Sequence, residues 1–151
     1  MSGVKLSNIS NKLLLYGSPT LRQRLKAEEG LRLKPYRCTS NRLTIGYGHN
    51  LDSGITEEAA EILLSMDIAH CTVDMIIIFG NFLSKISVKR QEVLLNMRFN
   101  LGSTGFLSFK KMIAAIKAED FDLAAKEMID SKWYTQVNKR AELLVTEMIK
   151  G

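Results

Sequence analysis

Residues 28–50 have the sequence Glu-Glu-Gly-Leu-Arg-Leu-Lys-Pro-Tyr-Arg-Cys-Thr-Ser-Asn-Arg-Leu-Thr-Ile-Gly-Tyr-Gly-His-Asn, and this stretch decides the fold. The two glutamates end a helix, because Gly30 directly after them is a typical helix stop. Apolar and charged residues then alternate, and Thr39-Ser40-Asn41 separates this run from a second one, Leu43-Thr44-Ile45. Alternation on both sides of a turn predicts a β-hairpin, which closes at Gly46–His49. We therefore expect a helix end that faces a small sheet across a cleft.

Cap signals place helices on either side of this stretch. Ser18-Pro19 is typical of a helix start, so we expect a helix from there to about Glu29, after an N-terminal extension over residues 1–17. Thr56-Glu57-Glu58 opens a second helix, of more than twenty residues, to about Ile78. Its apolar residues keep a 3.6-residue period and predict one apolar stripe, made of Ala59, Ile62, Leu63, Met66, Ala69, Val73, Ile76 and Ile77.

The remainder of the chain is predicted to be helical. Caps and turns delimit helices over 88–101, 109–118, 123–129 and 134–149, with a turn at 102–105. We therefore predict an α+β fold over residues 18–151, with a hairpin-bearing N-terminal lobe (about 18–55), a connecting helix (about 56–79) and a helical C-terminal lobe (about 80–151). The active cleft is expected between the two lobes.

The composition is that of a globular protein. With 151 residues, 46% of them hydrophobic, the chain is long enough to bury a sizeable core. The longest apolar run, Met75–Phe79, has five residues, far short of the roughly 20 that span a bilayer. Four apolar residues at 13–16 are too few for a signal-peptide core. We therefore expect no stable membrane insertion and synthesis into the cytoplasm.

Two cysteines, Cys38 and Cys71, are too few for a disulfide scaffold, and we expect both to be free thiols. The nearest approach to a metal site is His70, Cys71 and Asp74 on one helix. No second Cys/His pair completes a tetrahedral set. We therefore expect no metal and no cofactor, and interpret His70 and Asp74 as an i, i+4 ion pair beside a buried cysteine.

Charge is distributed unevenly along the chain. Residues 1–50 hold nine Lys and Arg against two glutamates, whereas residues 51–84 hold six acids and no Lys or Arg. The whole chain has a net charge of +5, which favours a polyanionic surface or polymer as partner. A nucleic acid is not expected, because the acidic middle of the chain interrupts the basic surface and the sequence has no basic recognition helix.

Three side chains of the deciding stretch can carry chemistry: Glu29, Cys38 and Thr44. A carboxylate at a helix C-terminus sits at the negative end of the helix dipole, which favours the protonated form that a general acid needs. The alternative is a solvated Glu29 paired with Lys26 or Arg32. Glycoside hydrolysis needs such an acid, with a second group acting on water or attacking the sugar directly, and a threonine hydroxyl can hold the water.

These residues also resemble a known family. Glu29-Gly30-Leu31-Arg32-Leu33-Lys34 and Thr44-Ile45-Gly46-Tyr47-Gly48-His49 are similar to the N-terminal motif of T4-type phage lysozymes, the endolysins of glycoside hydrolase family 24. A second block agrees: Asn96-Met97, Phe99, Gly102, Thr104-Gly105 and Phe109, then Ser131-Lys132-Trp133-Tyr134, Gln136 and Arg140-Ala141. The resemblance covers about residues 21–150 in colinear order.

The resemblance implies a lysozyme-like fold and a muramidase that cuts the β-1,4 bond between N-acetylmuramic acid and N-acetylglucosamine in peptidoglycan. It places the general acid on Glu29 and the positioning of water on Thr44. It puts Arg140 where the family has an arginine close to the catalytic glutamate. It further implies substrate contacts at Asn50, Phe99 and Asn100.

One departure from the family affects the chemistry: Cys38 stands where the family usually has an aspartate. An ordinary thiol is only a few per cent thiolate at neutral pH, but Arg37 and Arg42 are close enough in the hairpin to lower its pKa. Three roles follow for Cys38: a thiolate base for inversion, a nucleophile giving a thioether and retention, or a structural substitute in a weakened enzyme. A further departure is the short Asn50–Ile55 loop, which is expected to leave the cleft more open.

The resemblance also implies a setting. A phage enzyme of this type is monomeric, waits in the host cytoplasm and reaches the peptidoglycan of the periplasm after a holin opens the membrane. The rival hypothesis is a catalytically weakened protein that binds peptidoglycan without cutting it.

Overall fold

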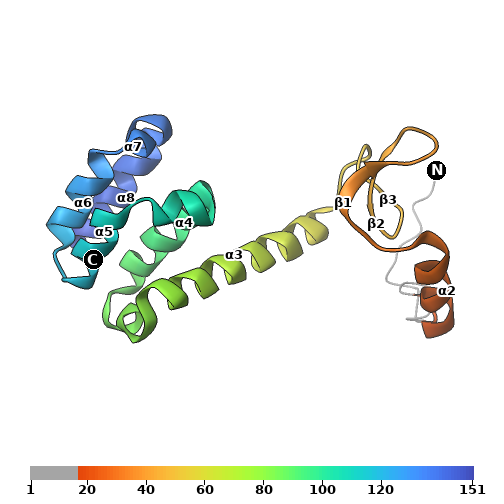
Figure 1. Cartoon of the computed structure of the whole chain (residues 1–151), viewed down its shortest axis with the longest axis horizontal. Coiled ribbons are helices and arrows are strands. Elements are labelled where there is room, and N and C mark those ends of the chain that lie inside the picture. Colours follow the sequence, from red (N-terminus) through yellow and green to blue (C-terminus); the bar gives the residue numbers. More distant parts are fainter. Residues whose placement is uncertain (1–16) are drawn as a thin grey trace, which may run out of the picture. The chain divides into compact units, whose positions relative to one another are not determined.

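The structure is a computed structural model that describes residues 17–151. It divides into two compact units, the first ending at Glu57 and the second spanning Glu58–Gly151, and each is described by itself (Figure 1). Apart from Gly17, the predicted N-terminal extension lies outside the described residues. Helices together with one small antiparallel sheet confirm the α+β fold class.

The first unit begins with helix α2, Pro19–Glu29, which starts and ends as predicted. The Ser18 hydroxyl caps it by accepting a hydrogen bond from the Leu21 N–H at 3.1 Å. At the other end Gly30 has a φ of +68°, which suits a glycine. The expected apolar face is not packed, since Leu21 and Leu25 are 46% and 44% exposed. Two leucines four residues apart are too little apolar surface to bury an eleven-residue helix.

The sheet of the first unit has three strands in the order β1-β2-β3: β1 (Arg32–Arg37), β2 (Leu43–Gly46) and β3 (His49–Asn50). The hairpin of β1 and β2 was predicted. β3 was not, because two residues are too short to show an alternation. The β1–β2 register is irregular between Arg32 and Tyr36, a span that contains Pro35. Proline cannot donate a ladder hydrogen bond, and it therefore suits an irregular part of an edge strand.

The second unit begins within the first turn of the long helix α3, Glu57–Phe79, which is followed by the 3₁₀ helix η2, Gly80–Lys85. The bounds of α3 confirm the predicted helix, but the predicted apolar stripe is wrong. The buried face consists of Cys71, Met75 and Phe79. Six residues of the predicted stripe are between 50% and 75% exposed, namely Ile62, Leu63, Met66, Val73, Ile76 and Ile77. Apolar residues occur on every side of α3, so periodicity alone could not select the buried face.

Among the described residues, one helical stretch, Glu57–Lys85, is long and apolar enough to cross a membrane by length and composition. One such helix is weak evidence for a membrane span, although only 17% of its apolar window is buried, unlike the mostly buried core helix of a soluble protein. The longest uninterrupted apolar run did not reveal this property, because Asp67 and Asp74 divide the apolar part of the helix.

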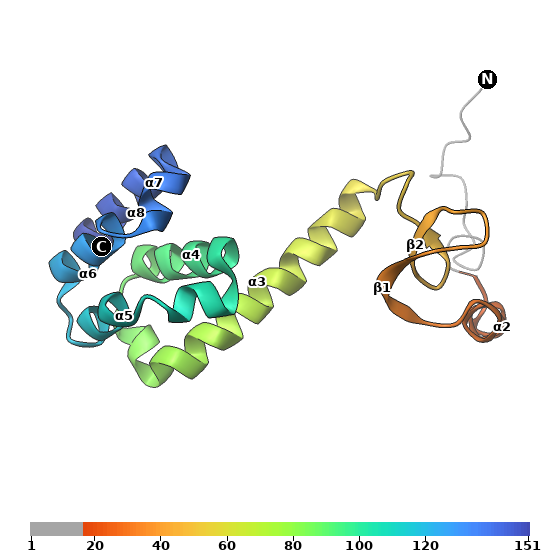
Figure 2. The same ribbon diagram turned by 45° about the horizontal axis from the view of Figure 1, so that its top comes forward.

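Five helices complete the second unit: α4 (Val88–Leu107), α5 (Lys110–Lys117), α6 (Phe121–Ile129), α7 (Lys132–Val137) and α8 (Lys139–Lys150). Figure 2 shows α4 to α8 gathered beside one end of α3. The predicted turn at 102–105 is a single break at Gly102, with a φ of +72°, after which α4 continues. The predicted 134–149 helix is two helices, divided at Asn138, whose φ is +48°.

The apolar core of the described chain lies in the second unit. Its largest fully buried side chains are Phe106, Met75, Leu94, Met97, Met112, Ile116, Met128 and Met148. Five of these eight are methionines, whose flexible side chains fill irregular space between short helices.

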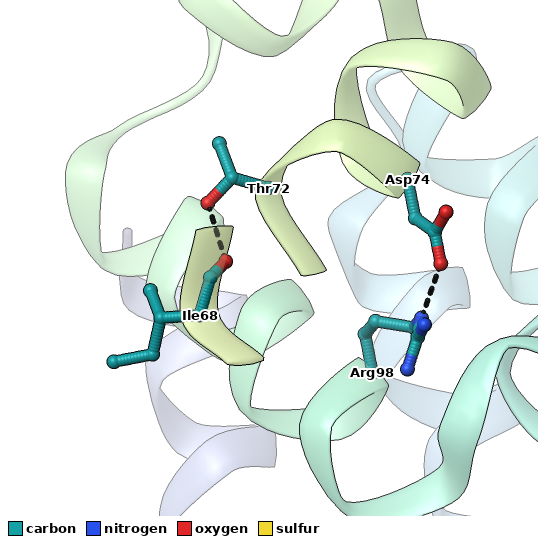
Figure 3. Close-up of polar contacts among 4 residues, drawn as sticks. All are labelled: Ile68, Thr72, Asp74 and Arg98. Atoms are coloured by element: carbon teal, nitrogen blue, oxygen red, sulfur yellow. Dashed lines mark hydrogen bonds and ion pairs between the residues drawn. The ribbon is translucent and has the colours of Figure 1, made fainter. Parts of the chain in front are cut away.

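An ion pair joins α3 to α4 within this unit (Figure 3). The Arg98 Nε–H donates to Asp74 Oδ2 at 2.6 Å. This hydrogen bond, more than any other interaction, holds the pKa of Asp74 below its ordinary value. The expected His70–Asp74 pair is therefore not the main interaction of Asp74, because an arginine from the neighbouring helix offers a closer, charged donor. Cys71, expected to be buried, is 4% exposed.

Candidate functional site

Glu29 is the last residue of α2, and its carboxylate lies against the turn between β2 and β3. A Cβ placed on Gly48 would stand 3.0 Å from Glu29 Oε2. Gly48 has a φ of +79° and no side chain, so the turn both needs a glycine and leaves room for the carboxylate. Glu29 itself is exposed. The helix end therefore delivers an accessible acid to the sheet of the same unit.

Cys38 follows β1 and begins a tight turn that ends at Arg42. The Cys38 N–H donates to the Arg42 carbonyl at 3.0 Å, and the Asn41 N–H donates to the Cys38 carbonyl at 2.8 Å. Asn41 takes a φ of +59°, a conformation that asparagine tolerates better than most residues. The turn leaves the Cys38 thiol half-buried, with the backbone folded around it.

This turn also sets the acidity of the thiol. The backbone N–H groups of Arg42 and Ser40 lower the pKa of Cys38 the most, and partial burial opposes them. The Thr44 side chain and the charge of Arg42 lower the pKa further. The expected lowering is therefore present, but amide donors contribute more than charge. Arg37 is not among its causes; its guanidinium donates to the Asn41 carbonyl at 2.9 Å.

Thr44 lies in the central strand and is 4% exposed, the only buried polar residue among those described. Its hydroxyl donates to the Arg42 carbonyl at 3.0 Å, the same carbonyl that accepts from the Cys38 N–H. Asn50 is directly opposite Thr44 in the β2–β3 register. The structure thus brings together three residues singled out in the sequence, Cys38, Thr44 and Asn50, on one small sheet.

The other singled-out residues belong to the second unit. Phe99 and Arg140 line the same hollow, of about 410 Å³, whose walls are largely apolar. The Arg140 Nε–H and NH2 groups both donate to Asn96 Oδ1, at 2.9 and 2.6 Å. This fork fixes the guanidinium on α8 against α4. Phe99 is 45% exposed, so its ring is available to a ligand.

Asn100, next along α4, is exposed and has a different partner. The Trp133 Nε1–H donates to Asn100 Oδ1 at 2.9 Å. Trp133 is 4% exposed and was named from the sequence only within the second block that resembles the family. The indole itself indicates that Trp133 makes a hydrogen bond, since a buried Trp N–H normally finds an acceptor. Which acceptor it finds could not be inferred from the sequence, because the two residues are 33 positions apart.

Cys71 is a free thiol beside this site, and it lines the hollow that Phe99 and Arg140 share. Burial raises its pKa, the opposite of the shift at Cys38. As for metals, no three His, Cys, Asp or Glu side chains within residues 17–151 come together as a ligand group.

Comparison with known proteins identifies the family. The model of the family described as "Phage lysozyme" matches residues 26–147, most of the chain. The chain belongs to the phage lysozyme family. It is 34% identical to an endolysin of Acyrthosiphon pisum secondary endosymbiont phage 1 over 113 residues, which cover 72% of this chain and 73% of that protein. This phage lysozyme therefore has a lysozyme-like α+β fold and is a hydrolase of the lysozyme class.

Two more distant relatives show how the family domain is used elsewhere. The pre-baseplate central spike protein Gp5 of Enterobacteria phage T4 is 29% identical, over 87% of this chain but only 28% of its own length. Probable T4-type lysozyme 2 of Dictyostelium discoideum is 23% identical, over 87% of this chain and 95% of its own length. This phage lysozyme is thus similar both to whole proteins and to one part of a larger one.

Proposed function

We propose that this protein is an endolysin that hydrolyses the β-1,4 bond between N-acetylmuramic acid and N-acetylglucosamine in peptidoglycan, and so lyses the bacterial host. Membership of the phage lysozyme family supports a peptidoglycan substrate, as does the similarity to a protein named endolysin. One observation carries the residue assignment. The Cys38 N–H and the Thr44 hydroxyl both donate to the Arg42 carbonyl, in the same unit whose β2–β3 turn receives the Glu29 carboxylate.

Glu29 is proposed as the general acid that protonates the leaving glycosidic oxygen. Its position at the end of α2 supports this role, because the carboxylate lies against the β2–β3 turn of the sheet whose central strand carries Thr44. Its exposure also does, since the acid has to reach a polymer that binds from solution. Glu28, one residue earlier, lies 3.8 Å from Arg24 in an exposed i, i+4 pair.

Cys38 takes the place of the family's usual aspartate, and three roles are open to it. A lowered pKa increases the thiolate fraction near neutral pH, which supports either a base that activates water or a nucleophile that attacks the sugar. In the first role Thr44 would hold the water in line, and the anomeric configuration of the product would be inverted. In the second role the anomeric configuration would be retained. In the third role Cys38 only preserves structure in a weakened enzyme.

Residues of both units are proposed to contact the substrate. Asn50 lies opposite Thr44, and Phe99 and Asn100 present an exposed ring and an exposed amide on α4. Arg140 is proposed as a supporting cation for the catalytic glutamate. The fork from Arg140 to Asn96 supports a fixed rather than a mobile guanidinium.

The proposed setting follows from the function. The enzyme acts as a monomer on glycan strands in the periplasm, after a holin releases it from the host cytoplasm, and needs no metal or cofactor. Its net charge of +5 favours a substrate that carries peptide carboxylates.

The decisive experiment compares Glu29→Gln with Glu28→Gln in a turbidity assay on outer-membrane-permeabilised Gram-negative cells. Loss of a general acid typically costs about 10²–10⁴ in rate, so Glu29→Gln should abolish lysis while Glu28→Gln lyses cells like the wild type. If the wild type binds cells without lysing them, the weakened wall-binding protein is the correct function. If both variants lyse cells normally, Glu29 is not the acid.

Cys38→Ser separates the roles of the thiol. A serine hydroxyl is a much weaker base and nucleophile than a thiolate, so activity should fall at least about a hundredfold if Cys38 takes part in the chemistry. Retained activity would support the structural role. NMR of the first-formed anomer then distinguishes inversion from retention for the wild type.

A further inference from the structure

The peptide group that joins Asn41 to Arg42 is held at its carbonyl end. Arg37, the last residue of β1, is exposed, and its guanidinium donates to the Asn41 carbonyl at 2.9 Å. The donor is charged, and charge-assisted hydrogen bonds are stronger than those between neutral groups. A side chain of β1 therefore reaches across the turn that follows the strand and binds one of its peptide groups.

The other end of the same peptide group is the N–H of Arg42. A peptide group is planar, and this one is trans, so its C=O and its N–H point in opposite directions. A donor that fixes the carbonyl therefore also fixes the direction of the N–H. The N–H of Arg42 is the largest of the causes that lower the pKa of the Cys38 thiol. Arg37 and the thiol thus interact with opposite ends of one peptide group.

The rest of the turn is held by other hydrogen bonds. On one side the Asn41 N–H donates to the Cys38 carbonyl at 2.8 Å; on the other, the Arg42 carbonyl accepts from the Cys38 N–H and the Thr44 hydroxyl, both at 3.0 Å. Asn41 between them has a φ of +59°, which an L-residue adopts at a cost. A peptide group can rotate about the two single bonds that flank it while its neighbours stay in place. The hydrogen bond from Arg37 opposes that rotation.

The same hydrogen bond also polarises the peptide group. A donor on the carbonyl draws electron density toward the oxygen and leaves the N–H more positive, which is how hydrogen bonds in a chain strengthen one another. An arginine guanidinium stays charged at the pH values at which a thiol titrates. Arg37 is not among the charges that lower the pKa of Cys38. Its effect therefore passes through the peptide group and not through space.

We propose that Arg37 is a positioning residue for Cys38: its guanidinium binds the carbonyl end of the peptide group between Asn41 and Arg42, and so holds the N–H end toward the thiol. The inference rests on the proposed function, because it takes Cys38 to act as a thiolate base or nucleophile. It adds a residue, outside the groups proposed for catalysis, on which the reactivity of Cys38 depends. Without this donor more of the thiol is protonated at neutral pH.

The first test measures the thiol directly. The full chain carries Cys71→Ser, so that Cys38 is its only cysteine. Alkylation by iodoacetamide is followed against pH, because it reports the thiolate. Arg37→Met removes the donor but keeps an unbranched side chain, and should slow alkylation at pH 7 about two- to tenfold, the effect of one hydrogen bond. The limiting rate at high pH should not fall, because access to the sulfur is unchanged.

Lys34→Met is the matched control. It removes the same charge from another exposed position of β1, away from the turn. The effect of a distant surface charge is screened by salt, so the alkylation rate at pH 7 should stay within about 1.5-fold of the parent. Far-UV circular dichroism verifies that each variant is folded.

The second test measures lysis of outer-membrane-permeabilised cells by proteins that retain Cys71. Arg37→Met should lyse them about two- to tenfold more slowly than Lys34→Met at pH 7. The ratio of the two rates should approach one as the pH rises, because more of the thiol ionises in both proteins. A ratio cancels the titration of the other groups, Glu29 included.

The proposal is overturned if Arg37→Met is alkylated like the parent, or if Lys34→Met shows an equal loss. It is also overturned if the limiting rate at high pH falls as much as the rate at pH 7, which would indicate lost access instead of lost thiolate. Slower alkylation with a lysis ratio of one at every pH would overturn it as well, and would support the structural role of Cys38. Failure of the proposed function as a whole is seen separately, as lysis that survives Glu29→Gln.

Discussion

The two units of this phage lysozyme hold their important side chains in different ways. Among the described residues of the first unit, only Thr44 is buried, and Cys38, Thr44 and Asn50 are placed by turns and strand register. The second unit contains every buried apolar residue described, and it holds Asn100 and Arg140 through hydrogen bonds from or to its packed helices. The proposed chemistry thus lies on the unit with little core, and much of the proposed binding lies on the unit with a large one.

The two cysteine thiols show the same difference between backbone hydrogen bonding and apolar packing. Cys38 is half-buried among backbone N–H groups, which lower its pKa. Cys71 is buried among apolar side chains, and desolvation raises its pKa. A unit held by backbone hydrogen bonds can stabilise a thiolate, whereas a unit held by apolar packing keeps a thiol neutral.

The largest effect should come from the core of the second unit. Phe106 is fully buried, so Phe106→Ala should lower the free energy of unfolding by about 3–5 kcal/mol. Leu33 in β1 is 80% exposed. Leu33→Ala should therefore change the free energy of unfolding by no more than about 0.5 kcal/mol. Urea denaturation followed by far-UV circular dichroism measures both. A large loss in Leu33→Ala would break the comparison, because it would mean that the first unit has an apolar core of its own.

A smaller effect, on activity instead of stability, should come from Gly48. Ala at this position would place a Cβ 3.0 Å from Glu29 Oε2, so the carboxylate has to move. Gly54 is the matched control, with a φ of +77° against +79° for Gly48 and nothing within 4 Å of a Cβ placed on it. Both Ala variants should lose about 1–2 kcal/mol of stability from the positive φ.

Their activities should differ. The carboxylate has to give way by only a few tenths of an ångström. Displacing a catalytic group by about 1 Å can cost up to a hundredfold, so this smaller shift should make Gly48→Ala lyse permeabilised cells about two- to tenfold more slowly than Gly54→Ala. Turbidity at equal concentrations of folded protein measures this ratio. Equal rates would show that the position of Glu29 against the turn does not matter for catalysis.

Local signals in the sequence were enough to predict much of the first unit. Ser18, Pro19 and Gly30 marked the ends of α2, and alternation marked β1 and β2. Glu29, Cys38 and Thr44 could be considered together because they lie within sixteen residues of one another. The part of the site in the first unit was therefore accessible from the sequence alone, although the catalytic roles are still proposals.

The contacts of the second unit were not accessible in this way. The partners in Asp74–Arg98, Asn100–Trp133 and Asn96–Arg140 are 24, 33 and 44 residues apart. Helical periodicity indicates the faces of a helix but not its neighbours, and on α3 it indicated the wrong face because apolar residues surround the helix. Packing selects these partners, and packing is a property of the whole unit.

The smallest and most specific effect concerns the two thiols. Alkylation by iodoacetamide follows the thiolate, so the pH at half-maximal rate reports each pKa. With Cys71→Ser, the remaining Cys38 should react with a midpoint below that of an ordinary thiol, because its pKa is lowered. With Cys38→Ser, the remaining Cys71 should react slowly and with a midpoint above it, since burial raises its pKa. Thr44→Val in the Cys71→Ser protein removes the hydroxyl whose presence helps to lower the pKa of Cys38. The Cys38 midpoint should therefore move upward, though not fully, because the N–H groups of Arg42 and Ser40 remain. Mass spectrometry measures the extent of alkylation at each pH. Coincident midpoints for the two thiols would show that the two environments do not differ as the structure indicates.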